Sequence, residues 1–275
     1  MSGARLFVSD IDGTLVTPDK QLTPAAIQAA VDVRAAGVPF SVVSSRPPRG
    51  MAKIVDAVRP TAPYAAFNGG SVVDIDGRLL QAHRLSPEAA GSTLQAMQRA
   101  GVRPWVFADD AWLLTDLNSP DVERERRTVG FGPTVVAGFD AVLDRIDKIV
   151  AASDDPGLLD RLEAELRAAV SVGTSVERSQ AYYVDVTHPR ANKGEAVRAI
   201  AAQVGADLAN TIVIGDMTND IAMFRVAGFA IAMGQAPDAV KAEAAAVTAA
   251  NTDEGFAKAV AQVVLPRMAA MEARA

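Results

Sequence analysis

Short, continuous apolar runs that end in polar residues or glycine set the strongest limit on how this chain can fold. They cover residues 5–9, 39–44, 64–67, 211–214 and 229–233, and so lie toward both ends of the sequence. Uninterrupted apolar runs of this length are typical of strands buried on both faces of a parallel sheet. Helical segments alternate with them. The alternation predicts one doubly wound α/β domain with a mostly parallel sheet.

The helices predicted for this domain lie between or after the apolar runs. The first begins with Thr23 as its N-cap and Pro24 in its first turn, and it stops at Gly37. The others cover residues 194–204, 220–226, 237–245 and 256–264.

The middle of the chain mixes hairpins and helices. Asp76-Gly77 and Asp109-Asp110 are turn signals inside two predicted hairpins. The other predicted elements are helices at 86–100 and 155–170 and strands at 146–151, 172–176 and 181–186. This pattern predicts an α+β domain inserted into the α/β domain. We place the insertion at residues 83–186, so that residues 1–82 and 187–275 form the α/β domain.

Composition excludes several kinds of site. The chain has no Cys and two His, His83 and His188, which rules out disulfides, thiolate zinc sites and a cysteine nucleophile. A bound metal must therefore have oxygen ligands, which favours Mg²⁺. The net charge of −6 argues against a nucleic-acid surface, and no apolar run approaches about 18 residues, so we expect no membrane span. We expect a cytoplasmic protein, and the pattern says nothing about its oligomeric state.

Acidic residues follow two of the predicted strands. Asp10 and Asp12 come after the first, and Asp216 comes after the fourth. In an extended segment, Asp10 and Asp12 would point the same way, roughly 6–7 Å apart. Carboxylates repel each other by about 4 kcal/mol at 4 Å in an effective dielectric of 20. A divalent cation relieves this repulsion, and Lys193, at the start of a predicted helix, would add a positive charge.

Such a site suits an anion that also binds the cation, and phosphate fits this description. The Ser44 hydroxyl and loop N–H groups near Gly13 and Ser45 are candidates for binding its oxygens.

Four segments in order along the chain resemble the signature motifs of the haloacid dehalogenase superfamily of phosphohydrolases. They are Asp10-Ile11-Asp12-Gly13-Thr14-Leu15, Ser44, Lys193 and Gly215-Asp216-x-x-Asn219-Asp220. The insertion between the second and third motifs, together with residues 67–70, resembles the Cof-type subfamily with an α/β cap. The resemblance implies a Rossmann-like catalytic core and a cap, residues 83–186, that sets substrate specificity.

The resemblance also implies catalytic roles. Asp10 would attack phosphorus and form an aspartyl-phosphate, and Asp12 would protonate the leaving oxygen and then activate water. Mg²⁺ would be bound by the Asp10 and Asp216 carboxylates and the Asp12 main-chain carbonyl. Asn219 and Asp220 would hold metal-bound waters or orient Lys193.

Binding roles follow in the same way. Ser44, Lys193 and Gly13 would bind the phosphoryl group. Residues expected to contact the rest of the substrate are Ser45, Arg46, Asn68 and Gly69. The chain departs from the subfamily at Ser44-Ser45-Arg46, where Thr-Gly-Arg is usual, and at Met217-Thr218, where a Gly-containing pair is usual. Neither change removes a catalytic group.

We therefore expect a Mg²⁺-dependent phosphatase that acts on a small phosphorylated metabolite, with a sugar phosphate as the first choice. One alternative is a phosphosugar mutase with the same core. The other is a catalytically silent metabolite-binding protein, which the presence of both Asp10 and Lys193 disfavours.

Other conspicuous residues are interpreted as structural. A second Asp-Ile-Asp-Gly, at 74–77, lies in a hairpin pattern and lacks the Thr-Leu that follows the first. The charged segment 123–127 is expected to be a solvated helix face rather than a substrate clamp. His83 and both Trp residues are expected to pack. For His188 and Asn192 we expect a structural hinge, with substrate contact as the alternative.

Overall fold

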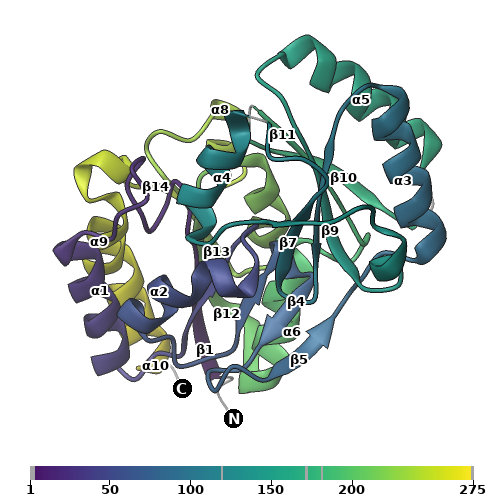
Figure 1. The fold of residues 1–275 in the computed structure, drawn as a ribbon. Helices are drawn as coiled ribbons and strands as arrows, with labels where there is room; N and C mark the ends of the chain where they lie inside the picture. Colours follow the sequence, from purple (N-terminus) through teal and green to yellow (C-terminus); the bar gives the residue numbers. More distant parts are fainter. Residues whose placement is uncertain (1–3, 119, 171–172, 181, 274–275) are drawn as a thin grey trace.

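Two β-sheets, each with its own helices, form the protein (Figure 1). The computed structural model describes residues 4–118, 120–170, 173–180 and 182–273. Within these ranges no helix is both long and apolar enough to cross a lipid bilayer.

The first sheet has the strand order β14-β13-β12-β1-β2-β3-β4-β5. Its strands are β1 Ala4–Asp10, β2 Phe40–Val43, β3 Tyr64–Ala66, β4 Ser71–Val73, β5 Leu79–Ala82, β12 Ala206–Gly215, β13 Phe229–Ala232 and β14 Ala246–Val247. Pairing is parallel from β14 to β3, and antiparallel where β4 and β5 are added at one edge. The predicted doubly wound, mostly parallel sheet is therefore confirmed.

Helices cover both faces of this sheet. They are α1 Pro24–Ala35, α2 Pro48–Val58, α6 Lys193–Val204, α7 Ile221–Phe224, α8 Asp238–Lys241, α9 Gly255–Ala259 and α10 Leu265–Glu272. Side chains alternate along β1, so Phe7 packs with α1, α2, α9 and α10, while Leu6 and Val8 pack with α6, α7 and α8. All three side chains are fully buried, which explains the uninterrupted apolar run.

Some helix bounds differ from the prediction. Helix α2 was not predicted, although Pro48 occupies its first turn. Helices α7 and α8 are shorter than the predicted 220–226 and 237–245. The predicted helix at 256–264 instead continues through a π-helical turn, Val260–Val264, into α10. Pro266 explains the π turn, because it lacks an N–H and its ring cannot pack against a regular preceding turn.

The second sheet has the order β10-β11-β9-β6-β7-β8. Its strands are β6 Pro104–Ala108, β7 Ala111–Leu114, β8 Thr134–Val135, β9 Ile146–Ala152, β10 Ser175–Gln180 and β11 Tyr183–Thr187. Helices α3 Pro87–Arg99 and α5 Pro156–Ala169 pack together on it. The Asp109-Asp110 turn is present, and both residues have positive φ. The predicted strands 172–176 and 181–186 begin at Val172 and Ala181, which lie outside the described residues.

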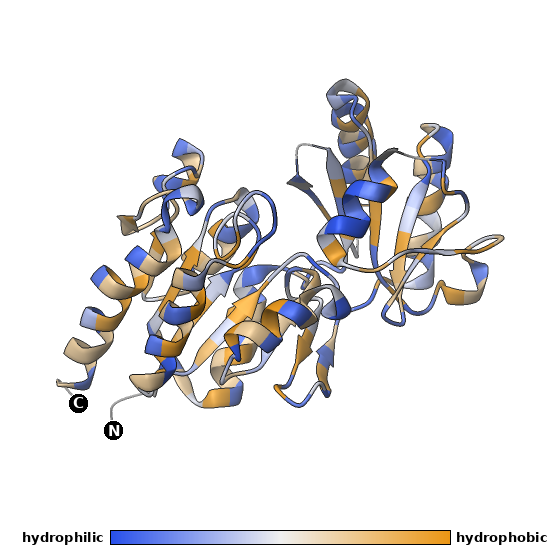
Figure 2. Ribbon diagram, turned by 60° about the vertical axis from the view of Figure 1, so that its left-hand side comes forward, coloured by the Kyte–Doolittle hydropathy of each residue, from blue (hydrophilic) through white to orange (hydrophobic). Residues whose placement is uncertain are grey.

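Two chain segments join the sheets, one after β5 and one after β11, and Figure 2 shows the two groups of elements side by side. Helix α4, Pro120–Val129, belongs to the inserted segment but lies against the first group. Val129 is in contact distance of Gly50 on α2, and Val122 joins the same apolar cluster as α2. The domain bounds at 83 and 186 remain a prediction.

Candidate active site

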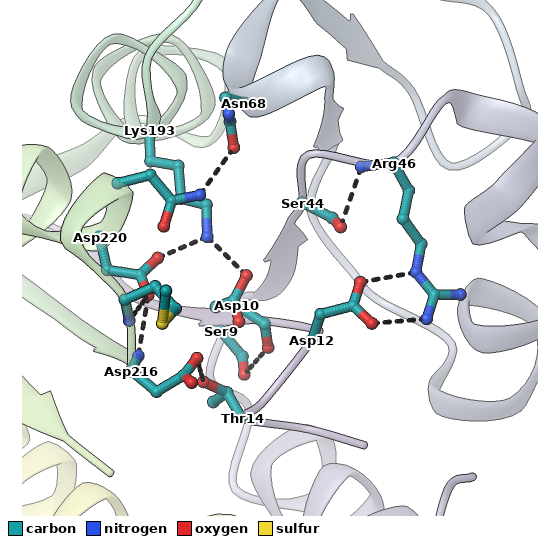
Figure 3. Close-up of polar contacts among 12 residues, drawn as sticks. Ser9, Asp10, Asp12, Thr14, Ser44, Arg46, Asn68, Lys193, Asp216 and Asp220 are labelled. Atoms are coloured by element: carbon teal, nitrogen blue, oxygen red, sulfur yellow. Dashed lines mark hydrogen bonds and ion pairs between the residues drawn. The ribbon is translucent and has the colours of Figure 1, made fainter. Parts of the chain in front are cut away.

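The predicted motifs meet at one edge of the first sheet. Strands β12, β1 and β2 are parallel neighbours, and their carboxyl ends lead directly into Asp216, Asp10 and Ser44. Ligands of open α/β sheets bind beyond this edge. Figure 3 shows these residues gathered around one region, together with Lys193 from the start of α6.

Lys193 lies at the centre of the cluster and is 1% exposed. Its ammonium group donates to Asp10 Oδ1 at 2.5 Å and to Asp220 Oδ1 at 2.5 Å. Burial alone would lower the pKa of Lys193, but the charges of Asp10 and Asp220 outweigh it and raise that pKa. The lysine is therefore held in its charged form.

Local sequence explains how Lys193 reaches this position. The Asn192 side chain caps α6 by accepting a hydrogen bond from the Glu195 N–H. At Gly194, a β-carbon would come within 2.6 Å of the Ala222 carbonyl oxygen. The glycine thus lets α6 approach α7 closely, and this approach places Lys193 beside Asp220.

Three carboxylates surround the ammonium group. Ligand atoms of Asp10, Asp216 and Asp220 lie within 4.8 Å of one another. Burial raises the pKa of Asp10 well above its ordinary value. Burial and the Asp220 charge raise the pKa of Asp216 to about 7. When all three carboxylates are ionised, the single positive charge of Lys193 does not balance them.

A hard divalent cation fits these residues. The donor set consists of carboxylate oxygens, which Mg²⁺ prefers. The side-chain oxygen of Asn219, beside Asp220 in sequence, is buried and has no hydrogen-bond partner within the described part of the chain. Asp220 itself is engaged, since its second oxygen accepts from the N–H groups of Asp216 and Met217. Asp10 and Asp216 are therefore the carboxylates of this group that could hold a cation, with Asn219 close by, and their role as metal ligands stays a prediction.

Asp216 is positioned by groups from two other segments. Thr14 donates to one of its oxygens at 3.3 Å, and Gln235 donates to the other at 3.4 Å and to the Gly13 carbonyl at 2.6 Å. Gly13 has φ of +88°, and a β-carbon there would lie 2.2 Å from the Asp216 carboxylate. Gln235 was not predicted, because no pattern around it distinguishes it from other polar loop residues.

Asp12 binds different partners from Asp10, and the expectation that the two carboxylates point the same way stays a prediction. Strand β1 ends at Asp10, and the N–H groups of Leu15 and Val16 turn back to the Ile11 carbonyl, which ends the extended geometry. The Asp12 carboxylate instead receives two hydrogen bonds of 2.7 Å from Arg46 (Figure 3).

Lys20 adds a third bond to Asp12, at 2.8 Å. Burial would raise the pKa of Asp12, but hydrogen bonds and charges from Arg46 and Lys20 outweigh it and hold the pKa below its ordinary value. Asp12 is therefore ionised in this arrangement. Lys20 was not predicted, since it lies outside the four motifs.

The predicted phosphate and substrate residues lie at the same edge. The Ser44 hydroxyl accepts from the Arg46 N–H, and the Ser44 carbonyl accepts from the Asn68 N–H. The buried Asn68 side chain accepts from Asn219 at 3.2 Å. A β-carbon at Gly69 would come within 2.7 Å of the Asn192 carbonyl oxygen. The turn at 67–70 thus bridges the segments before α6 and α7.

The charged segment on α4 was only partly interpreted correctly. Glu123, Arg126 and Arg127 are exposed, as expected of a solvated face. Glu125 is 6% exposed and faces the region of Asp12, so the prediction was wrong for this residue. The helical pattern shows that Glu125 lies on another face than Glu123, but not what that face meets.

The structural interpretations of other residues agree with their contacts. The second Asp-Ile-Asp-Gly forms the turn between β4 and β5, where Asp74 pairs with Arg78. Both Trp residues are buried and contact each other edge to face. His83 and His188, which follow β5 and β11, stack on each other with ring centroids 5.2 Å apart.

Comparison with known proteins identifies the class. The chain matches the haloacid dehalogenase-like hydrolase family over residues 7–260 and belongs to that family. Two curated relatives are the HMP-PP phosphatase of Cronobacter sakazakii and the pyridoxal phosphate phosphatase YbhA of Escherichia coli. The first is 28% identical over 240 residues, covering 87% of this chain and 88% of the relative. The second is 26% identical over 264 residues, covering 92% and 96%.

Solved structures agree on the fold. A haloacid dehalogenase-like hydrolase from Bacteroides thetaiotaomicron superposes with a TM-score of 0.86 at 22% identity, over 94% of this chain and 99% of the other. The subclass IIB sugar phosphatase BT4131 superposes with a TM-score of 0.83 at 22% identity, over 95% and 100%. The predicted family and fold class are confirmed.

Proposed function

We propose that this protein is a Mg²⁺-dependent phosphatase that hydrolyses a small phosphorylated metabolite through an aspartyl-phosphate. The observation that carries the proposal is the buried Asp10 carboxylate, held by Lys193 and adjacent to Asp216 and Asp220. Family membership and relatives named as phosphatases support phosphoric monoester hydrolysis.

Asp10 is the nucleophile of the proposed reaction. Its oxygen forms a bond to phosphorus while the bond between phosphorus and the ester oxygen breaks, and the leaving oxygen takes a proton. Water then attacks the phosphorus of the aspartyl-phosphate, which releases inorganic phosphate and restores Asp10. Lys193, fixed by Asp220, stabilises the negative charge on the phosphoryl oxygens, and the Ser44 hydroxyl and the N–H groups near Gly13 bind them.

A cation held by Asp10, Asp216 and the Asp12 main-chain carbonyl would neutralise charge on the phosphoryl oxygens and allow an anionic substrate to approach a carboxylate. We propose that Asn219 and Asp220 would support this site without contacting the cation directly, by binding water molecules around it or by orienting Lys193.

Asp12 is the proposed acid and base. In its ionised state it can accept the proton of the attacking water. To protonate the leaving oxygen it must first gain a proton, which its bonds to Arg46 and Lys20 oppose. We therefore propose that the phosphate of the substrate binds the side chains of Arg46 and Lys20. Asp12 then loses its bonds to them and can take up the proton that the first step requires.

A sugar phosphate is the proposed substrate, with Ser45, Arg46, Asn68 and Gly69 near it and residues 83–186 as the cap that covers it. The relatives are named for HMP-PP and pyridoxal phosphate, and one structural neighbour for sugar phosphates. All are small phosphorylated metabolites.

The test is phosphate release from a panel of phosphorylated metabolites, with Mg²⁺ present. Asp10→Asn should lower kcat by about 10³-fold or more, because an amide cannot serve as the nucleophile. Asp74→Asn is the matched control, since Asp74 begins the same four-residue sequence in a hairpin. Activity that survives Asp10→Asn, or that persists in excess chelator, would contradict the proposal.

A further inference from the structure

A small cavity lies beside Asp12, where the two groups of elements meet. Its volume is about 30 Å³, which is room for about two water molecules. Asp12 and Arg46 line it from the first group, and Glu125, Lys148 and Tyr183 line it from the second. The proposed function directs the leaving oxygen of the substrate toward Asp12, so hydroxyl groups on the carbons next to that oxygen would reach into this cavity.

Lys148 and Asp185 form a buried ion pair next to the cavity. Lys148 on β9 is 5% exposed, and Asp185 on β11 is 2% exposed. Because β9 and β11 are antiparallel neighbours, the two side chains meet across the strands, and Lys148 Nζ donates to Asp185 Oδ2 at 3.2 Å. Lys148 also donates to the Ser45 carbonyl at 3.1 Å, which connects the pair to the phosphate-binding loop.

The polar groups of this cluster are incompletely satisfied. Asp185 Oδ1 is buried and has no hydrogen-bond partner among the described residues. Glu125 is also buried, and its carboxyl group lies among Lys148, Asp185 and Tyr183. Burying polar groups without partners destabilises a protein, because the hydrogen bonds to water that they lose on folding are not replaced. If these residues served only to hold the two groups of elements together, the bonds from Lys148 to Asp185 and to the Ser45 carbonyl would be sufficient.

The chemistry of the cluster matches hydroxyl groups. Within the cavity, Lys148 and Tyr183 can donate hydrogen bonds and Glu125 can accept them. Asp185 does not line the cavity, but it accepts a hydrogen bond from Lys148 and so fixes that side chain. An alcohol hydroxyl is at once a donor and an acceptor, so neighbouring hydroxyls can satisfy such a mixed set. A leaving group without further hydroxyl or amino groups, such as p-nitrophenol, would bring no donor to these carboxylates.

We propose that Glu125 and Lys148, with Asp185 positioning Lys148, bind hydroxyl groups on the carbons next to the ester oxygen and make the enzyme select phosphate esters of polyols and sugars. This inference rests on the proposed function, because it assigns the leaving-group side of that same site.

The experiment compares two substrates in the full chain with Mg²⁺. One is glucose 6-phosphate or another sugar phosphate turned over in the panel above, and the other is p-nitrophenyl phosphate, whose leaving group has no alcohol hydroxyl. Glu125→Gln keeps the shape of the side chain but removes the carboxylate. The ratio of kcat/KM for the sugar phosphate to that for p-nitrophenyl phosphate should fall about 10- to 100-fold, mainly through KM.

Glu123→Gln is the matched control, since Glu123 lies on the same helix and is exposed; its ratio should equal that of the wild type. If Glu125→Gln does not fold, Asp185→Asn serves as the second variant, with the same expected fall in ratio. An equal loss on both substrates, or an unchanged ratio in both variants, overturns the inference. Failure of the wild type to release phosphate from any member of the panel overturns the proposed function itself.

Discussion

Gly13 satisfies two separate requirements at once. Its φ of +88° is a backbone conformation that L-residues rarely adopt, and a β-carbon there would collide with the Asp216 carboxylate. We predict that Gly13→Ala loses most of its activity and most of its Mg²⁺ affinity, because Asp216 must move. Phosphate release and isothermal titration with Mg²⁺ measure the two effects.

Gly77 provides the control for backbone strain. It has φ of +86°, but a β-carbon there meets nothing within 4 Å. Gly77→Ala should therefore lose roughly 1 kcal/mol of stability or somewhat more, and keep its affinity for Mg²⁺. If Gly13→Ala bound Mg²⁺ as tightly as Gly77→Ala, the role of Gly13 in placing Asp216 would be refuted.

At the scale of elements, strand β9 anchors the first of the two connections between the sheets. The Leu85 N–H donates to the Ile146 carbonyl, and Arg84 donates to Asp147 at 3.2 Å. Asp147 is 5% exposed, and its burial, only partly offset by Arg84, raises its pKa to about 6. The native state therefore binds a proton here that the unfolded chain has already lost.

This pKa sets a pH window for stability. Between pH 4 and pH 6 the native protein holds more protons than the unfolded chain at this site, so the Asp147 contribution is lost as pH rises. We predict that the melting temperature of Asp147→Asn, relative to the wild type, increases from pH 4 to pH 6 and is level above pH 7. The full effect is at most about 3 kcal/mol. A difference that is constant across this range would show that Asp147 titrates normally.

For the whole molecule, Lys193 connects the ends of strands that are far apart in sequence. Its pairs with Asp10 and Asp220 join α6 to β1 and to the turn after β12. Removing one partner of a buried ion pair leaves an uncompensated charge, which costs about 3–5 kcal/mol. We predict that Lys193→Met lowers the melting temperature by roughly 5–15 °C and that millimolar Mg²⁺ restores part of the loss.

The control for this prediction is Lys53→Met, because Lys53 is exposed on α2. Its melting temperature should stay within about 2 °C of the wild type. Differential scanning calorimetry with and without Mg²⁺ separates the two variants, and an unaltered melting temperature in Lys193→Met would contradict the account of the buried cluster.

Much of the fold was accessible from the sequence for a local reason. Apolar runs such as 211–214 reflect burial on both faces of a strand, and Thr23-Pro24 reflects the residue preferences of a helix N-terminus. Helix α2 was missed because Pro47-Pro48 and Gly50 suggest a loop. The meeting of Asp10 and Asp216 followed from the rule that parallel strands end at one edge, whereas Lys193, at the start of a helix, was assigned to the site by its motif.

Tertiary structure alone decided the direction and surroundings of individual side chains. The sequence determined that Asp12 lies two residues after Asp10, but the turn at Ile11 and the position of Arg46 decided what Asp12 faces. Likewise, no local pattern connects Glu125 with Lys148 and Asp185. Spacing along the chain specifies which face of an element a residue occupies. Contacts between distant segments depend instead on how the elements pack against each other. That packing is determined only when the whole chain is folded.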